Sequence, residues 1–126
     1  MKRILFIDDE SYILTAIERM LRQNQGRWDM LFENSGDSAL AACDANPFDV
    51  VFSDMRMPGM DGITLLGHIR DRFPTTGRII LSGYSEAAQI RSISIAHRVV
   101  SKPCSRGELE SAIESVLMMR EEGDQR

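Results

Sequence analysis

The side chains best suited to chemistry in this 126-residue sequence are carboxylates, one hydroxyl and one ammonium group. They stand in four separate segments, Asp8-Asp9-Glu10, Asp54, Ser82-Gly83 and Lys102-Pro103. Carboxylates gathered in one place repel one another and therefore need a cation. Ligation by oxygen atoms suits a hard ion such as Mg²⁺, which keeps several waters and also contacts phosphate oxygens. If the fold unites these segments, they predict a Mg²⁺ site.

The same set of residues fits phosphoryl chemistry. A carboxylate beside a metal ion can attack phosphorus and form an aspartyl phosphate. The loose transition state of phosphoryl transfer needs positive charge around its equatorial oxygens. Lys102 and the cation would supply that charge, and the Ser82 hydroxyl would donate to another oxygen. We therefore expect a phosphoryl or Mg²⁺ site wherever these groups meet.

Short apolar runs alternate with longer amphipathic segments along the chain. The runs predict strands at residues 3–7, 28–33, 47–53, 78–82 and 97–101. Helical spacing of apolar residues predicts helices at 11–24, 37–45, 63–73, 85–96 and around 109–117. Ser35 and Asp61 are candidate N-caps, and Ser105 with Glu108 is a candidate capping box.

This alternation predicts an α/β fold with a doubly wound, five-stranded parallel sheet of the flavodoxin-like (βα)5 type. Five units in 126 residues give about 25 residues each, a length that favours right-handed crossovers with helices on both faces. In such sheets the site lies beyond the carboxyl ends of the strands. All four chemical segments follow predicted strands, so we expect them at one edge.

Each residue also has a simpler interpretation. Asp8 or Asp9 would serve equally well as a helix cap. Ser82 alone is typical of a turn hydroxyl, and Lys102 alone of a solvated surface charge. The coincidence of all four strand ends favours the chemical interpretation.

Composition limits the other options. The 15 basic and 19 acidic residues give a net charge of −4, which lacks the basic footprint of a duplex-binding domain. No apolar run reaches the roughly 18 residues of a membrane span, and Ile4 to Ile7 is too short for a signal peptide. Cys43 and Cys104 have no metal-site spacing and indicate ordinary thiols. We expect a cytoplasmic protein without direct nucleic-acid or membrane contact. Its single domain should cover residues 1–120, and a polar tail or linker stub should follow at 121–126.

Taken together, the segments resemble the receiver domain of bacterial two-component response regulators. The resemblance runs from Ile4 to about Leu117. Its motifs are Ile-Leu-Phe-Ile-Asp8-Asp9-Glu10, Ser53-Asp54-Met-Arg-Met-Pro58-Gly-Met-Asp61-Gly62, Leu81-Ser82-Gly83-Tyr84 and Ser101-Lys102-Pro103. It implies the strand order 2-1-3-4-5 and a phosphoacceptor switch rather than an enzyme with turnover. It also implies a sensor histidine kinase or phosphotransfer protein as partner.

The resemblance assigns roles to individual residues. Asp54 would be the phosphoacceptor, Lys102 would contact the phosphoryl group, and Ser82 would be the switch hydroxyl. The Mg²⁺ ligands would be Asp9, Asp54 and the backbone carbonyl of Arg56, with Asp8 acting largely through water. The Lys102-Pro103 bond is expected to be cis, which X-Pro bonds tolerate at modest cost.

One departure from the family affects the switch. The usual Tyr or Phe three residues before the lysine is Val99 here, so there is no ring to turn inward. Tyr84 could gate the pocket instead, or simply be an exposed loop residue. The Arg56 side chain is in range of the phosphoryl group or an acidic neighbour, and a solvated loop charge is an equal alternative. The switched face, formed by the fourth helix, fifth strand and fifth helix, is expected to include Ile95, Val99 and Glu114.

Three sequence segments most resemble those of receivers joined to HD-type output domains (HDOD or HD-GYP). They are Asp-Met-Arg-Met-Pro-Gly-Met-Asp-Gly, Leu-Ser-Gly-Tyr and His97-Arg-Val-Val-Ser-Lys-Pro-Cys104. A C-terminal HD-type output domain is therefore a candidate partner, as is a second copy of the chain.

Three other functions compete with the switch. A phosphohydrolase of the haloacid dehalogenase type would carry Asp-x-Asp at the nucleophile, but Arg56 occupies the second position. A receiver fold used only for phosphorylation-independent binding remains the main alternative. A flavodoxin-like FMN protein is disfavoured by the acidic end of the first strand, because a phosphate cradle there needs amides and hydroxyls.

Overall fold

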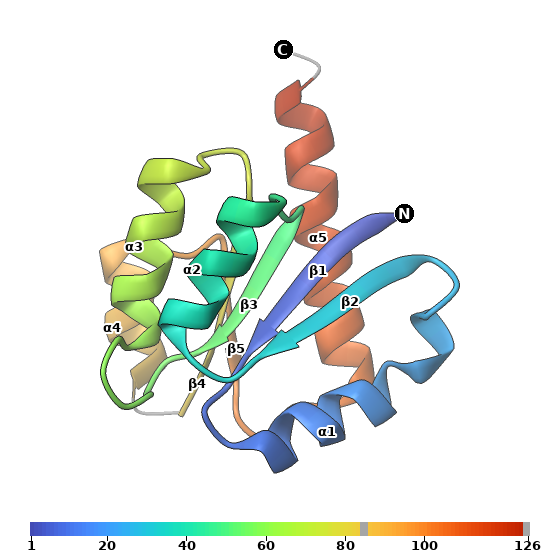
Figure 1. Ribbon diagram of the computed structural model, residues 1–126, viewed down its shortest axis with the longest axis horizontal. Helices are drawn as coiled ribbons and strands as arrows, with labels where there is room; N and C mark the ends of the chain where they lie inside the picture. Colours follow the sequence, from blue (N-terminus) through green and yellow to red (C-terminus); the bar gives the residue numbers. More distant parts are fainter. Residues whose placement is uncertain (84–85, 125–126) are drawn as a thin grey trace.

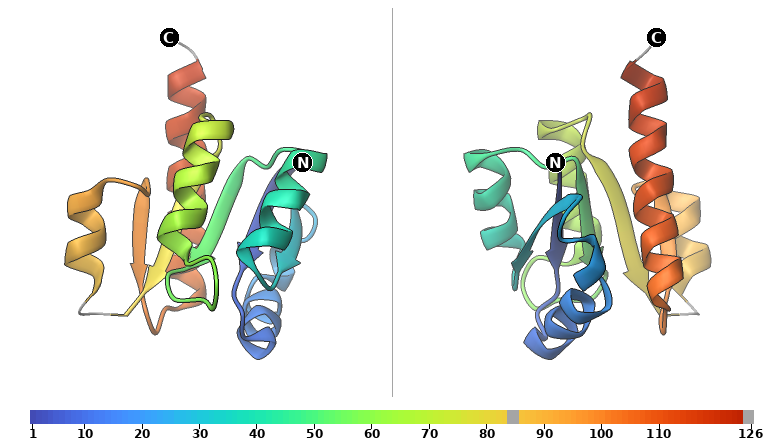
Figure 2. Two further views of the ribbon diagram at one scale, coloured as in Figure 1. Left: turned by 60° about the vertical axis from the view of Figure 1, so that its left-hand side comes forward. Right: turned by 90° about the vertical axis from the view of Figure 1, so that its right-hand side faces the viewer.

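The computed structural model describes residues 1–83 and 86–124, and within them the chain forms a parallel sheet covered by helices on both faces (Figures 1 and 2). The strands are β1 (Lys2–Ile7), β2 (Trp28–Glu33), β3 (Val50–Asp54), β4 (Gly77–Ser82) and β5 (Arg98–Ser101). The helices are α1 (Ser11–Met20), α2 (Gly36–Ala45), α3 (Gly62–Arg72), α4 (Ala87–Ile93) and α5 (Arg106–Asp124), with a 3-10 turn η1 (Arg22–Asn24). The strand order β2-β1-β3-β4-β5, with every pair parallel, confirms the predicted fold class and topology.

Alternate residues of the central strands face two separate cores, as expected for strands buried on both faces. Ile4 and Phe6 of β1 pack with the apolar sides of α1 and α5. Leu5 and Ile7 point the other way, into a core with α2, α3 and α4. Figure 2 shows this three-layer arrangement, with the carboxyl ends of the strands at one edge.

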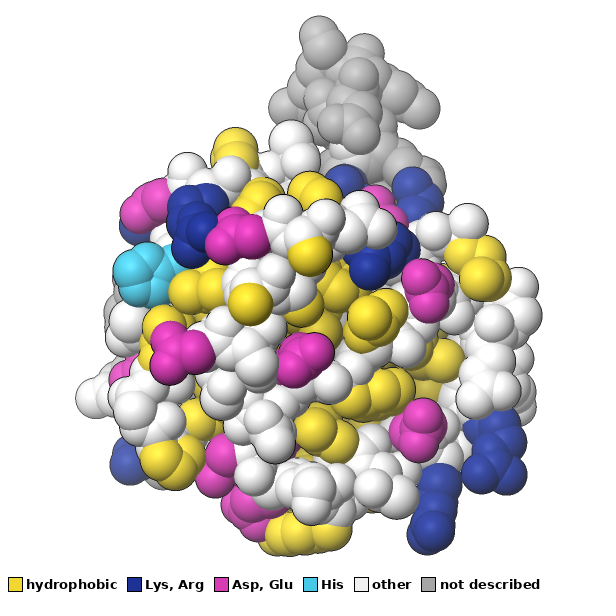
Figure 3. All heavy atoms as spheres, in the orientation of Figure 1, with side chains coloured by type: hydrophobic (Ala, Val, Ile, Leu, Met, Phe, Trp, Pro, Cys, Tyr) yellow, Lys and Arg dark blue, Asp and Glu magenta, His cyan; other side chains and the backbone are white. Residues whose placement is uncertain are grey.

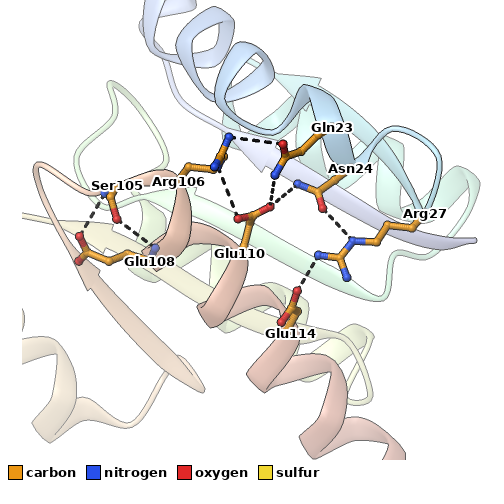
Figure 4. Close-up of polar contacts among 8 residues, drawn as sticks. All are labelled: Gln23, Asn24, Arg27, Ser105, Arg106, Glu108, Glu110 and Glu114. Carbon is orange, nitrogen blue, oxygen red and sulfur yellow. Dashed lines mark hydrogen bonds and ion pairs between the residues drawn. The ribbon is translucent and has the colours of Figure 1, made fainter.

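Local side-chain chemistry fixes where several helices begin. The Ser35 hydroxyl accepts from the Ser38 backbone N–H, and the Asp61 carboxylate accepts from that of Thr64. Ser105 and Glu108 satisfy each other's backbone N–H groups at 3.1 and 3.2 Å, so the capping box is confirmed (Figure 4).

The predicted element bounds were wrong in places. The helix expected over 11–24 ends at Met20, and a 3-10 turn follows, a common way to tighten a helix end. The third strand begins at Val50 instead of Pro47, which has no N–H to donate, and it includes Asp54. The fourth helix ends at Ile93, because Ser94 takes a left-handed conformation with φ 58°.

A polar network connects the η1 turn with α5 (Figure 4). Asn24, which is 3% exposed, donates to Glu110 at 2.8 Å and accepts from Arg27. Arg27 also forms an ion pair with Glu114 at 2.6 Å. Glu114 therefore faces Arg27 in the turn after η1, and its predicted place on the switched face was wrong.

The last helix is longer than the apolar pattern indicated. Helical backbone extends through Asp124, beyond the expected domain boundary at residue 120, and that boundary stays a prediction. Arg120 contacts Asp49 at 2.7 Å and donates to the Thr75 carbonyl, which ties α5 to the edge where the strands begin. Burial opposes ionisation of Asp49, but hydrogen bonds from Arg3 and Arg120 outweigh it and lower the pKa of that carboxyl.

Across the residues that the structure describes, none of the helices combines the length and apolar character that crossing a bilayer requires.

Candidate functional site

The sheet register brings the chemical segments to one edge. Ile7 pairs with Ser53, so Asp8 and Asp54 follow neighbouring positions on adjacent strands. Asp54 pairs with Leu81, one residue before Ser82. Ser82 in turn pairs with Ser101, one residue before Lys102. Parallel pairing thus assembles four distant segments without help from loop conformation.

An ion pair at this edge joins Asp54 and Lys102. The Lys102 Nζ lies 2.6 Å from Asp54 Oδ1, and the Asp54 side chain is 5% exposed. Partial burial opposes the charge on Lys102, but the contact with Asp54 outweighs it and raises the pKa of the ammonium group. A buried carboxylate therefore has a fixed positive charge beside it, on a side chain that is itself 41% exposed.

Acidic side chains gather next to Asp54, where β1 ends and α1 begins (Figure 3, lower edge). Carboxylate oxygens of Asp8, Asp9 and Glu10 lie within 4.8 Å of one another. Asp8 is 2% exposed, and its Oδ1 accepts from the Glu10 backbone N–H at 2.9 Å. Its Oδ2 is buried without a hydrogen-bond partner. Burial, together with the charges of Asp54 and Asp9, raises the pKa of Asp8 to about 6.

Ser82 lies at this edge, and its hydroxyl bonds to the backbone of the next residue. The side chain is 1% exposed, and Oγ donates to the Gly83 carbonyl at 2.9 Å. The Lys102 backbone N–H donates to the Ser82 carbonyl at 2.8 Å, which joins the β4 and β5 ends. The Lys102-Pro103 bond is cis, as expected.

Gly62 allows α3 to start close to the end of β3. A Cβ at this position would lie 2.2 Å from the Asp54 carbonyl oxygen and 3.0 Å from the Met55 Cα. The Gly62 N–H donates to the Met55 carbonyl at 2.8 Å. Any side chain here would push the helix away from the loop that follows Asp54.

The Arg56 side chain forms an ion pair with Glu86. Sequence reasoning allowed for an acidic neighbour but did not identify Glu86, which is 30 residues away and in no recognisable motif. Val99 is half-buried against the core, and Ile95 is buried. Tyr84 lies outside the described residues.

The family model for the response regulator receiver domain matches residues 4–114. The chain therefore belongs to the response regulator receiver domain family, in which phosphorylation-dependent signalling is typical. Members of this family act as phosphoacceptor switches served by histidine kinases and generally bind Mg²⁺ at an acidic pocket.

Curated relatives include longer transcriptional regulators. The chain is 34% identical over 87 residues to the hydrogenase transcriptional regulatory protein HoxA of Cupriavidus necator, covering 69% of this chain and 17% of that protein. It is 42% identical over 80 residues to the DNA-binding transcriptional regulator NtrC of Salmonella typhimurium, covering 64% and 17%. The chain thus spans only a small part of the length of these relatives.

Solved structures agree with the family. A response regulator receiver domain protein from Clostridium thermocellum superposes with a TM-score of 0.85 at 29% identity, covering 96% of this chain and 98% of that one. The signal receiver domain of an HD domain-containing protein from Pseudomonas fluorescens gives a TM-score of 0.88 at 29% identity, covering 99% and 93%.

Proposed function

We propose that this chain accepts a phosphoryl group on Asp54 from a sensor histidine kinase or phosphotransfer protein in the cytoplasm, with Mg²⁺. The observation that carries the proposal is the buried Asp54 carboxylate, 2.6 Å from the Lys102 ammonium and beside the acidic cluster. A carboxylate, a fixed cation and an acidic pocket at one sheet edge are the parts that acyl-phosphate formation needs.

The donor set fits Mg²⁺. The unpartnered, buried Oδ2 of Asp8 needs a cation or a metal-bound water, and clustered carboxylates meet the preference of a hard ion for oxygen ligands. Asp9, Asp54 and the Arg56 carbonyl would hold the ion directly, and Asp8 largely through water. When bound, Mg²⁺ would neutralise charge on the phosphoryl oxygens.

The chain's own residues would carry out the transfer. An Asp54 carboxylate oxygen would form the new O–P bond as the P–N bond to the donor histidine breaks, and the imidazole nitrogen would keep the electron pair. Lys102 is already in position to hold a phosphoryl oxygen. The Ser82 hydroxyl would leave the Gly83 carbonyl and donate to a second oxygen, which would draw the β4 and β5 ends inward.

An apolar groove of about 440 Å³ borders Lys102 and offers a surface for the phosphodonor. Its lining residues come from α1, β4 and the loop after β5: Ile13, Ala16, Ile17, Met20, Leu81, Lys102, Pro103 and Cys104. An amphipathic helix of the donor seated there would bring its phosphohistidine beside Asp54. Ala16→Arg would then slow transfer from a phosphorylated histidine protein but leave phosphorylation by acetyl phosphate unchanged.

The switched face would act on a partner, and an HD-type output domain is the partner we favour. One support is the structural similarity to the receiver domain of an HD domain-containing protein from Pseudomonas fluorescens. The other is the sequence segments around Asp54, Ser82 and Lys102. Residues 1–120 would form the receiver, and 121–126 would lead out of it.

The test is the intact mass of the chain after incubation with acetyl phosphate, with and without Mg²⁺, beside Asp54→Ala. The proposal expects a gain of one phosphoryl group that needs Mg²⁺ and is absent from the variant. No gain in a folded wild-type chain would contradict it and favour a phosphorylation-independent binding module.

A further inference from the structure

One ion pair connects the loop after the phosphoacceptor with the start of α4. Arg56 stands two residues after Asp54, and its Nε donates to Glu86 Oε1. The Arg56 side chain is 78% exposed, whereas that of Glu86 is 18% exposed. Two segments that lie 30 residues apart in the sequence are thus joined by opposite charges at the edge of the site.

Glu86 occupies the N-cap position of α4, but its side chain does not cap the helix. A side chain at this position usually accepts from a backbone N–H of the first turn. The helix has seven residues, and the described residues that bury it against the core are Ala87 and Ile90. Its beginning is therefore held in part by the contact with Arg56.

Phosphorylation would give Arg56 a stronger partner. A phosphoryl group on Asp54 brings nearly two negative charges and three acceptor oxygens to a position two residues away. Guanidinium groups bind phosphate in a bidentate manner, with shorter and stronger hydrogen bonds than neutral pairs make. The existing pair is largely exposed on the Arg56 side, and such pairs contribute little.

We infer that Arg56 exchanges partners on phosphorylation, leaving Glu86 for the phosphoryl group and releasing the start of α4. The inference rests on the proposed function and deepens it, because it names a route to α4 that needs no aromatic ring at Val99. By reciprocity, a change that frees Arg56 from Glu86 strengthens the binding of Arg56 to the phosphoryl group, and a bound guanidinium would hinder the approach of water to that group.

The test compares wild type with Glu86→Gln and Arg56→Ala. The matched control is Asp44→Asn, which breaks the exposed pair between Arg72 and Asp44 that joins α3 to α2. The first readout is the half-life of the phosphoryl group on Asp54, followed by intact mass after acetyl phosphate is removed. The second is hydrogen exchange of the α4 backbone amides with and without the phosphoryl group.

Glu86→Gln is expected to lengthen the half-life about two- to five-fold, the range that losing an exposed ion pair allows, and to speed exchange in unphosphorylated α4. Arg56→Ala should shorten the half-life, speed the same exchange, and abolish the further increase that phosphorylation causes in wild type. Asp44→Asn should match wild type in both readouts.

Two outcomes would overturn the inference, and they are distinguishable. If wild type takes up the phosphoryl group but both variants behave like Asp44→Asn, the partner exchange is wrong and the proposed function stands. If wild type takes up no phosphoryl group, the proposed function fails and the inference fails with it.

Discussion

Replacing Asp8 by Asn should stabilise the metal-free protein. Asp8 is 2% exposed, with one oxygen that lacks a partner, and burial raises its pKa from 3.8 to about 6. This rise corresponds to roughly 3 kcal/mol of unfavourable free energy for the ionised group in the folded state at pH 7.5. Asn carries no charge, and its carbonyl can still accept from the Glu10 N–H.

We expect Asp8→Asn to raise the free energy of unfolding by about 1–3 kcal/mol at pH 7.5 without Mg²⁺, because part of the gain is lost in repacking the amide. The assay is urea unfolding in EDTA, followed by the fluorescence of Trp28, the single tryptophan, which is 4% exposed. Asp71→Asn is the control, since its side chain is 69% exposed and should change stability by less than about 0.5 kcal/mol.

The pH dependence gives an independent check. The folded-state pKa of Asp8 lies above its unfolded value, so its contribution to stability is complete below pH 3.8 and is lost as pH rises through about 6. Wild type should therefore gain stability from Asp8 on acidification from pH 7.5 to 5, and Asp8→Asn should lack that component. Added Mg²⁺ should stabilise wild type more than the variant. If Asp8→Asn lowers stability at pH 7.5 while Asp71→Asn is neutral, the electrostatic reasoning is refuted.

Three further predictions follow from contacts at or near the sheet edges. Gly62→Ala should destabilise the fold by about 1–3 kcal/mol in the same assay, because its Cβ would lie 2.2 Å from the Asp54 carbonyl, whereas Gly26→Ala, with open space around it, should not. Lys102→Met should slow formation of the acyl phosphate about 100-fold, measured by intact mass, and an unchanged rate would contradict its role. Burial, then the charge of Arg78, lowers the pKa of His97, whose Nδ1 accepts from the Arg78 N–H at 3.0 Å. The contribution of neutral His97 to stability should be lost as pH falls below 6.5. His97→Gln should lessen this acid destabilisation. The comparison is made in the Asp8→Asn background, because Asp8 has the opposite pH dependence.

Much of the fold follows from local sequence signals. The strands could be predicted because their apolar runs are continuous, as burial on both faces requires. The caps at Ser35 and Asp61 could be predicted because each makes a contact only three residues away. Once the topology is parallel and doubly wound, the shared edge of Asp8, Asp54 and Lys102 follows from geometry.

What could not be predicted depends on contacts between distant segments. Asn24 bonds to Glu110 across 86 residues, and the helix expected over 11–24 ends in a 3-10 turn beside this contact. Glu114 faces Arg27 across 87 residues, a choice between helix faces that a charged residue does not reveal by itself. The orientation of Ser82 toward Gly83 is different, because it is a rotamer choice within two adjacent residues that the residue types alone do not fix.

The course of α5 has a mechanical consequence. Asp54 lies at the carboxyl edge of the sheet, whereas α5 starts near that edge and ends beyond the opposite one (Figure 1). Nineteen helical residues at 1.5 Å each give a rod of about 28 Å. Arg120 joins the far part of this rod to Asp49, at the edge where the strands begin. Each helical residue turns by about 100°. Inserting one residue after Asp124 would therefore rotate the residues after it about the helix axis by that angle. Inserting seven residues, which make nearly two turns, would almost restore their orientation.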